Sequence, residues 1–307
     1  MNTYRVCFVA GLVLVLTGCG VAEFLIKRTI SNLEQKVATE IKDYADFTPA
    51  QERHIDQIAY RIASRIRGER LPLLVQHLEL LASEIEQEQR ISADAWRTLT
   101  LFLESPVALS DKPDLIHLIA DLTYDMTQEQ RDSTITNVEQ MYEKRLENLQ
   151  ASSPDDRNDK ILKMTRRAFN ELGLSRSRAQ WKSAREFLSA RESYLPLEIE
   201  AAQRNYERFI GLLRTRGDSR QAYRRDFLDA WRLAEQPYVK RAPATWQKNF
   251  LVSHEMVSRL LQDVDVDEAQ EAAYELREYA ALLTELSWTS GQAELTFADA
   301  DCASGCL

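Results

Sequence analysis

Glycine is scarce in this chain, with 9 among 307 residues. Globular proteins average about 7 % glycine, and these glycines form no cluster of the kind that cradles phosphate groups. No segment alternates apolar and polar residues as a half-buried strand would. The 8 prolines fall mostly between segments of helical periodicity, which is typical of helix ends. The sequence therefore predicts an all-α protein, either an elongated multi-helix bundle or two helical lobes, with no sheet.

A long apolar run is also missing near the N-terminus. The apolar segment 6–16 is about half of the roughly 20 residues that a membrane-spanning helix needs. One positive residue, Arg5, precedes it, and small residues follow it. That order is typical of a secretory signal. The alternative is an ordinary secretory signal that is cleaved at another position, in which case Cys19 has no special role.

The end of this segment, Leu16-Thr17-Gly18-Cys19, resembles the lipobox of bacterial lipoproteins. The resemblance implies that residues 1–18 are removed as a signal peptide and that Cys19 carries acyl chains such as palmitate. Residues 19–22 would then be the lipidated tether. Gly20 is not the aspartate that retains lipoproteins in the inner membrane of Gram-negative bacteria. The resemblance thus implies the outer membrane, on its periplasmic face.

Cysteine is limited to four positions. Cys7 lies in the predicted signal and Cys19 at the predicted lipidation site, which leaves Cys302 and Cys306. The periplasm is oxidising, so these two are expected to form a small disulfide loop or to remain free thiols. Two thiolates without a nearby histidine are an incomplete zinc site, and we predict no metal.

Charge is unevenly distributed along the chain. Residues 19–156 carry 15 basic and 25 acidic side chains, residues 157–250 carry 21 and 11, and residues 251–307 carry 2 and 12. A basic middle segment is able to bind lipid headgroups, lipopolysaccharide phosphates or an acidic partner. Packing of the acidic helices beside the basic ones is the simpler alternative.

A recurring motif marks several expected helix starts: an apolar residue, then threonine or aspartate, then glutamine three residues later. It occurs with Thr48 and Gln51, with Thr127 and Gln130, and, with Asp267 as cap, with Gln270. Such a pair is expected to form a capping box at a helix N-terminus. Weaker copies without the glutamine begin at residues 91, 109 and 174, and Gly68 is expected to end the helix that Thr48 begins.

These signals divide the chain into consecutive parts. We expect an N-terminal acidic helical part (23–150), a linker with the sequence ASSPDDRND (151–159), a C-terminal helical part (160–288) and an acidic tail with two cysteines (289–307).

The segment DYADFTPAQ, residues 43–51, carries a family resemblance. Together with the lipobox it resembles an uncharacterised family of proteobacterial lipoproteins, a domain of unknown function with a DYxDLTPxQ signature. Membership implies an all-helical lipoprotein and no known activity. The Thr-x-x-Gln elements are also faintly similar to the LTxxQ motif of Spy- and Cpx-type periplasmic chaperones.

Catalytic constellations are lacking too. The 4 histidines, at 54, 77, 117 and 254, are far apart in sequence, and no nucleophile elbow or glycine-rich phosphate loop is present. We therefore predict a protein that is not an enzyme and needs no cofactor. The expected role is an envelope interaction or scaffold protein with an envelope protein partner, or alternatively a periplasmic chaperone or stress adaptor. Neither a nucleic-acid partner nor a small-molecule substrate is evident.

Overall fold

The computed structural model describes residues 27–104, 108–217, 219–236 and 238–287, and throughout these ranges it contains helices and no strand. The predicted all-α class is confirmed. The predicted lipidation site Cys19, its preceding residues Leu16, Thr17 and Gly18, and the tail with Cys302 and Cys306 lie outside the described residues. The helices are α3 (Leu33–Lys42), α4 (Pro49–Arg65), α5 (Leu71–Glu88), α6 (Ala93–Glu104), α7 (Pro113–Tyr124), α8 (Gln128–Ala151), α9 (Pro154–Glu171), α10 (Arg178–Leu188), α11 (Leu195–Arg214), α12 (Arg220–Glu235), α13 (Tyr238–Arg241), α14 (Pro243–Leu261) and α15 (Val266–Leu286).

Gly68 does not end a helix, contrary to our expectation. A π-helical segment, Ile66–Arg70, joins α4 to α5, so helical backbone continues from Pro49 to Glu88. The physical reason is Pro72, whose ring would clash with the carbonyl four residues earlier and which donates no hydrogen bond. The wider turn accommodates the proline without breaking the helix. Its Arg67 is buried and pairs with Glu34 of the neighbouring helix α3.

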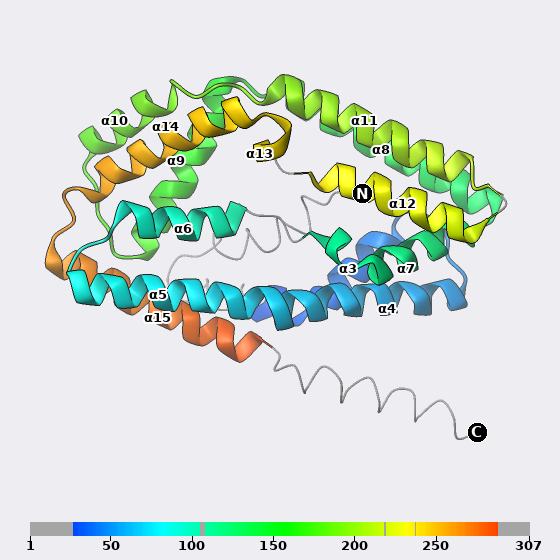
Figure 1. The fold of residues 1–307 in the computed structure, drawn as a ribbon, viewed down its shortest axis with the longest axis horizontal. Helices are drawn as coiled ribbons and strands as arrows, with labels where there is room; N and C mark the ends of the chain where they lie inside the picture. The colour runs from blue at the N-terminus through cyan, green and yellow to red at the C-terminus, as the bar shows by residue number, and fades with distance from the viewer. Residues whose placement is uncertain (1–26, 105–107, 218, 237, 288–307) are drawn as a thin grey trace.

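The predicted N- and C-terminal parts are interlocked (Figure 1). Helix α5 packs along α15, and α8 packs along α11. In both pairs, a long helix of one part therefore contacts a long helix of the other part. Helix α12 likewise packs on α7, and α14 on α6. We call α3–α8 the first unit and α9–α15 the second unit. These contacts between the units come in matched pairs, in which the units exchange roles. The contact of α5 with α15 corresponds to that of α11 with α8, and the contact of α7 with α12 corresponds to that of α14 with α6.

One apolar cluster runs through both units. It includes Leu33, Ile55 and Leu78 from the first unit and Trp181 and Leu276 from the second. Burial of apolar side chains is the main stabilising term in folding. The interlocked helices therefore share a single core.

The predicted linker is mostly helical. Residues 154–159 form the start of α9, and only Ser152 and Ser153 separate α9 from α8. The sequence-based interpretation overlooked that Ser153 and Asp156 form a capping box followed by proline at the first position. The polar composition that suggested a linker belongs to a helix N-terminus, where serine, proline and aspartate are favoured.

Candidate functional site

The two predicted threonine capping boxes meet in space. Thr48 caps α4 with Gln51, and Thr127 caps α8 with Gln130. The two glutamine amides bind each other, Gln130 Nε2 donating to Gln51 Oε1 at 2.8 Å and Gln51 Nε2 to Gln130 Oε1 at 3.1 Å. Gln130 Nε2 also donates to the Asp46 carbonyl at 2.7 Å. We call this arrangement the first cap junction, and it joins two helix starts that lie 79 residues apart.

A second cap junction joins the starts of α10 and α15. Ser177 and Gln180 form a capping box on α10, and Gln180 Nε2 donates to Asp263 just before α15 at 2.8 Å. In return, Glu268 of α15 accepts from the Ser175 backbone N–H at 3.2 Å. The helix that we expected to begin near residue 174 thus begins after Ser177.

The N-cap of the last helix lies two residues before the position that we predicted. Asp265, and not Asp267, caps α15 and accepts a hydrogen bond from Glu268 N at 2.8 Å. Asp267 lies in the first turn and Gln270 lies farther along the helix. Asp265 is favoured as the N-cap because Glu268, three residues later, also accepts the Ser175 N–H in the second cap junction.

A polar cluster adjoins the first cap junction. Arg224 Nε donates to Asp121 at 2.7 Å, and Arg220 pairs with both Asp121 and Asp125. Burial alone would raise the pKa of Asp121, but the two guanidinium groups outweigh it and lower that pKa. Burial lowers the pKa of the His54 imidazole, although the nearby carboxylates of Asp121 and Asp125 act to raise it.

The lowered pKa of His54 predicts a pH-dependent stability. An unfolded histidine takes up its proton near pH 6.5, while folded His54 does so only at lower pH. Protonation of the unfolded chain therefore favours unfolding, and stability falls as pH drops from about 7.5 to about 5.5. We expect His54→Gln to flatten this decline in the thermal midpoint. An equally steep decline in the His54→Gln chain would contradict the assignment.

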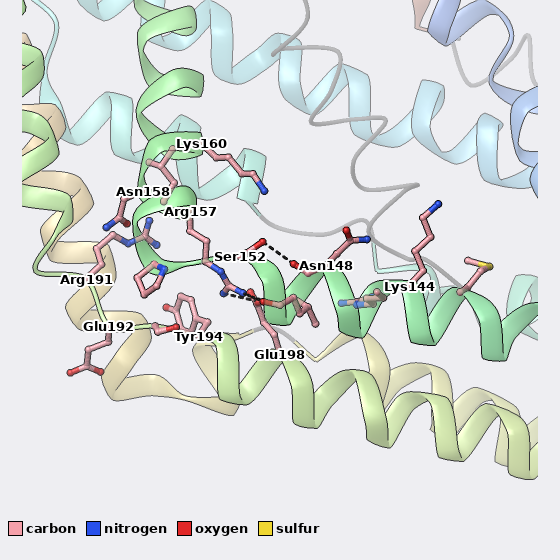
Figure 2. A pocket seen from close by; sticks show the side chains of 16 residues that line it. Lys144, Asn148, Ser152, Arg157, Asn158, Lys160, Arg191, Glu192, Tyr194 and Glu198 are labelled. Carbon is pink, nitrogen blue, oxygen red and sulfur yellow. Dashed lines mark hydrogen bonds and ion pairs between the residues drawn. The ribbon is translucent and has the colours of Figure 1, made fainter.

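A charged pocket lies where α8 ends and α9 begins (Figure 2), and we call it the cationic pocket. It has a volume of about 630 Å³, and the loop between α10 and α11 contributes to its wall. Five positive and two negative side chains line it: Lys144, Arg145, Arg157, Lys160, Arg191, Glu192 and Glu198. The pocket is therefore net positive within a chain whose net charge is −9.

Both acidic residues of the cationic pocket already have cationic partners. Glu198 accepts from Arg157 Nη1 at 2.9 Å. Glu192 accepts from Lys248 Nζ, which lies outside the lining, at 2.8 Å, and this bond lowers the pKa of Glu192. Among the described carboxylates, none forms an ion pair with Lys144. The ammonium group of Lys144 is thus available to an anion.

An apolar cavity of about 400 Å³ lies next to the cationic pocket, among α3, α4, α7, α8, α11 and α12. Its wall is mostly aliphatic and aromatic, with Ile58, Ile62, Ile119, Leu122, Val138, Leu213, Phe227 and Trp231 among the lining residues. Its exposed polar residues are Glu40 on α3, Asp43 just after α3, and Gln140 and Lys144 on α8. The cavity therefore opens along the seam between α3 and α8.

The cationic pocket is lined by none of the confirmed capping residues Thr48, Gln51, Thr127 and Gln130, which serve helix starts. The four histidines lie on α4, α5, α7 and α14. Over the described part of the chain, no group of three or more His, Cys, Asp or Glu side chains is arranged to hold a metal ion. No described helix is both long and apolar enough to cross a membrane.

No protein-family model, curated protein or solved structure matches this chain. The resemblances of residues 16–19 and 43–51 therefore stay predictions. Sequence reasoning also missed both cavities, because their walls come from helices far apart in the chain. The one available signal was the basic composition of residues 157–250, which supply Arg157, Lys160 and Arg191.

Proposed function

We propose that this chain is a lipoprotein anchored through Cys19 to the periplasmic face of the outer membrane, and that it acts without catalysis by binding an anionic group of an envelope component. The observation that carries the proposal is the cationic pocket, with five positive side chains in an acidic chain. Membership of the uncharacterised lipoprotein family is part of the same proposal.

The chemistry of the cationic pocket favours phosphate or carboxylate ligands. Arginine and lysine form charge-assisted hydrogen bonds that are about twice as strong as neutral ones. A pocket of one sign also attracts oppositely charged ligands from a distance. Because Glu192 and Glu198 are already paired, an incoming anion meets the ammonium groups of Lys144 and Lys160.

The proposed anchor would hold the first described helix near lipid. Eight residues lead from Cys19 to Lys27, the first described residue. A chain extends at most about 3.6 Å per residue, so Lys27 would lie within about 30 Å of the bilayer surface.

Replacing Cys19 by serine is expected to release the protein from membranes. The serine hydroxyl is not the thiol that receives the lipid, and two or more acyl chains are needed for stable anchoring. Fractionation of cells should move the variant from the membrane pellet to the soluble fraction, while Cys302→Ser should stay in the pellet. Retention of the Cys19→Ser chain in the pellet would contradict the anchor.

Charge reversal in the cationic pocket is expected to weaken binding to anionic vesicles. For the full Cys19→Ser chain, we expect Lys144→Glu/Lys160→Glu to reduce binding to phosphatidylglycerol vesicles about tenfold, since each lost ionic contact of an exposed lysine is worth about 0.2–1 kcal/mol. Raising NaCl from about 50 mM to about 500 mM should weaken the parent chain similarly.

A matched control separates the pocket from overall charge. Lys163→Glu/Lys182→Glu makes the same charge change at two exposed lysines that do not line the pocket. If this control loses as much vesicle binding as the pocket variant, the pocket is not the binding site and the proposal fails.

The chaperone alternative has a structural observation in its favour. Leu73 and Leu80 of α5 are 48 % and 60 % exposed, and exposed apolar side chains can hold unfolded clients. In-cell crosslinking followed by mass spectrometry separates the two functions. A broad set of newly exported proteins would favour the chaperone, whereas one dominant envelope component supports our proposal.

A further inference from the structure

The cationic pocket and the apolar cavity share part of their walls. Met141 and Lys144 of α8 line both. Toward the C-terminal end of α8, the lining of the cationic pocket continues with Arg145 and Asn148, and then with Ser152 just after the helix. In the opposite direction along α8, the lining of the apolar cavity continues with Val138 and Thr134. A single helix thus carries a positively charged site at its C-terminal end and an apolar cavity beside its middle.

The apolar cavity suits a hydrocarbon chain. Its volume falls within the range of about 300–1,000 Å³ that is typical of small-molecule pockets. Each methylene group that leaves water for such a cavity contributes about 0.8 kcal/mol. The only cationic side chain in its wall is that of Lys144, on the side of the cationic pocket.

The helix contacts give the cavity wall a counterpart elsewhere in the fold. By the exchange of roles between the units, α9, α10 and α6 correspond to α3, α4 and α12. There Phe169 meets Trp96 with ring centroids 5.3 Å apart and Trp181 at 5.7 Å, both edge to face. Phe169 is fully buried. Among α9, α10 and α6, aromatic rings thus pack edge to face around a fully buried phenylalanine.

We propose that the cationic pocket and the apolar cavity together bind one anionic amphiphile, a phosphate-bearing lipid. Its phosphate lies between Lys144 and Lys160, and its acyl chain passes Met141 into the cavity beside Trp231. This inference rests on the proposed function and adds the ligand class. The carboxylates of Glu40 and Asp43 stand at the α3 side of the cavity rim, so the phosphate is held at the α8 side.

The site can be tested by tryptophan quenching. Trp231 lines the cavity and is 2 % exposed, so a brominated acyl chain in the cavity should quench its fluorescence. The probe is lysophosphatidylglycerol with a brominated 16-carbon chain, titrated below its micelle concentration into the full Cys19→Ser chain, which cannot carry its own anchor lipid. We expect saturable quenching that is largely lost in Trp231→Phe.

Variants and probes then separate headgroup from chain. Lys144→Glu/Lys160→Glu should weaken binding about tenfold, whereas Lys163→Glu/Lys182→Glu should not. Shortening the acyl chain from 16 to 12 carbons should weaken it about a hundredfold. Val138→Phe, at the partly exposed edge of the cavity, should abolish quenching but leave binding of glycerol phosphate unchanged. Its thermal midpoint, compared with that of the parent chain, shows whether it is folded.

Each other outcome overturns part of the account. If glycerol phosphate binds as tightly as the lysolipid, the cavity takes no acyl chain, and this inference fails while the proposed function stands. If lysophosphatidylcholine binds as tightly, the anionic headgroup is not selected, and the inference fails. If neither the lysolipid nor glycerol phosphate binds, the proposed function fails with it.

Discussion

Replacing Phe169 by alanine is expected to lower the free energy of unfolding by about 3–5 kcal/mol, the usual cost of truncating a buried aromatic residue. Phe169 is 0 % exposed and lies in the shared apolar cluster. The loss combines burial of the ring, its edge-to-face contacts with Trp96 and Trp181, and the cavity that remains. Urea unfolding should show a lower midpoint.

Met164 is the matched control for this substitution. It lies on the same helix α9 and is 50 % exposed, so Met164→Ala should change stability by no more than about 0.5 kcal/mol. If Phe169→Ala and Met164→Ala had equally small effects, the aromatic core of the second unit would not be packed as described.

Replacing Gln130 by alanine is expected to cost about 2–4 kcal/mol. Gln130 is buried, and its amide serves the Thr127 N–H, the Asp46 carbonyl and the Gln51 amide at once. Removing it takes a partner from each of these part-buried groups, at about 1–3 kcal/mol for each one that water does not reach. Gln128→Ala, at an exposed position in the same turn, should be nearly neutral.

A glutamate at position 130 separates the two roles of this residue. Gln130→Glu keeps an oxygen that accepts the Thr127 N–H and so retains the capping box. It loses the donor to the Asp46 carbonyl and to Gln51. We expect urea unfolding to show most of the alanine loss. Wild-type stability in Gln130→Glu would mean that the box alone matters and that the cap junction contributes nothing.

Local signals along the chain were sufficient for the fold class and for two helix starts. Threonine with glutamine three residues on satisfies backbone donors within one turn, so Thr48 and Thr127 are recognisable without tertiary structure. Near Asp267 the chain offers aspartate at 263, 265 and 267. Choosing Asp265 required the contact of Glu268 with residues 175 and 176, which lie about 90 residues away.

The candidate site depends on packing that sequence periodicity does not encode. Lys144 and Lys160 face one pocket only because α8 turns directly into α9, at the place that we had interpreted as a linker. The meeting of Gln51 with Gln130 likewise brings together two separate motifs. Charge composition indicated the basic segment, but Lys144 lies outside it, in the part that composition classed as acidic.

The most direct test of the account is the lipid content of the protein as it leaves the cell. The full Cys19→Ser chain, purified from the envelope without its own anchor, should carry close to one phosphate-bearing lipid per molecule by mass spectrometry. Lys144→Glu/Lys160→Glu should lose this lipid, and Lys163→Glu/Lys182→Glu should keep it. Equal lipid content in both double variants, or only neutral lipid in the parent chain, would contradict an anion-binding role for the cationic pocket.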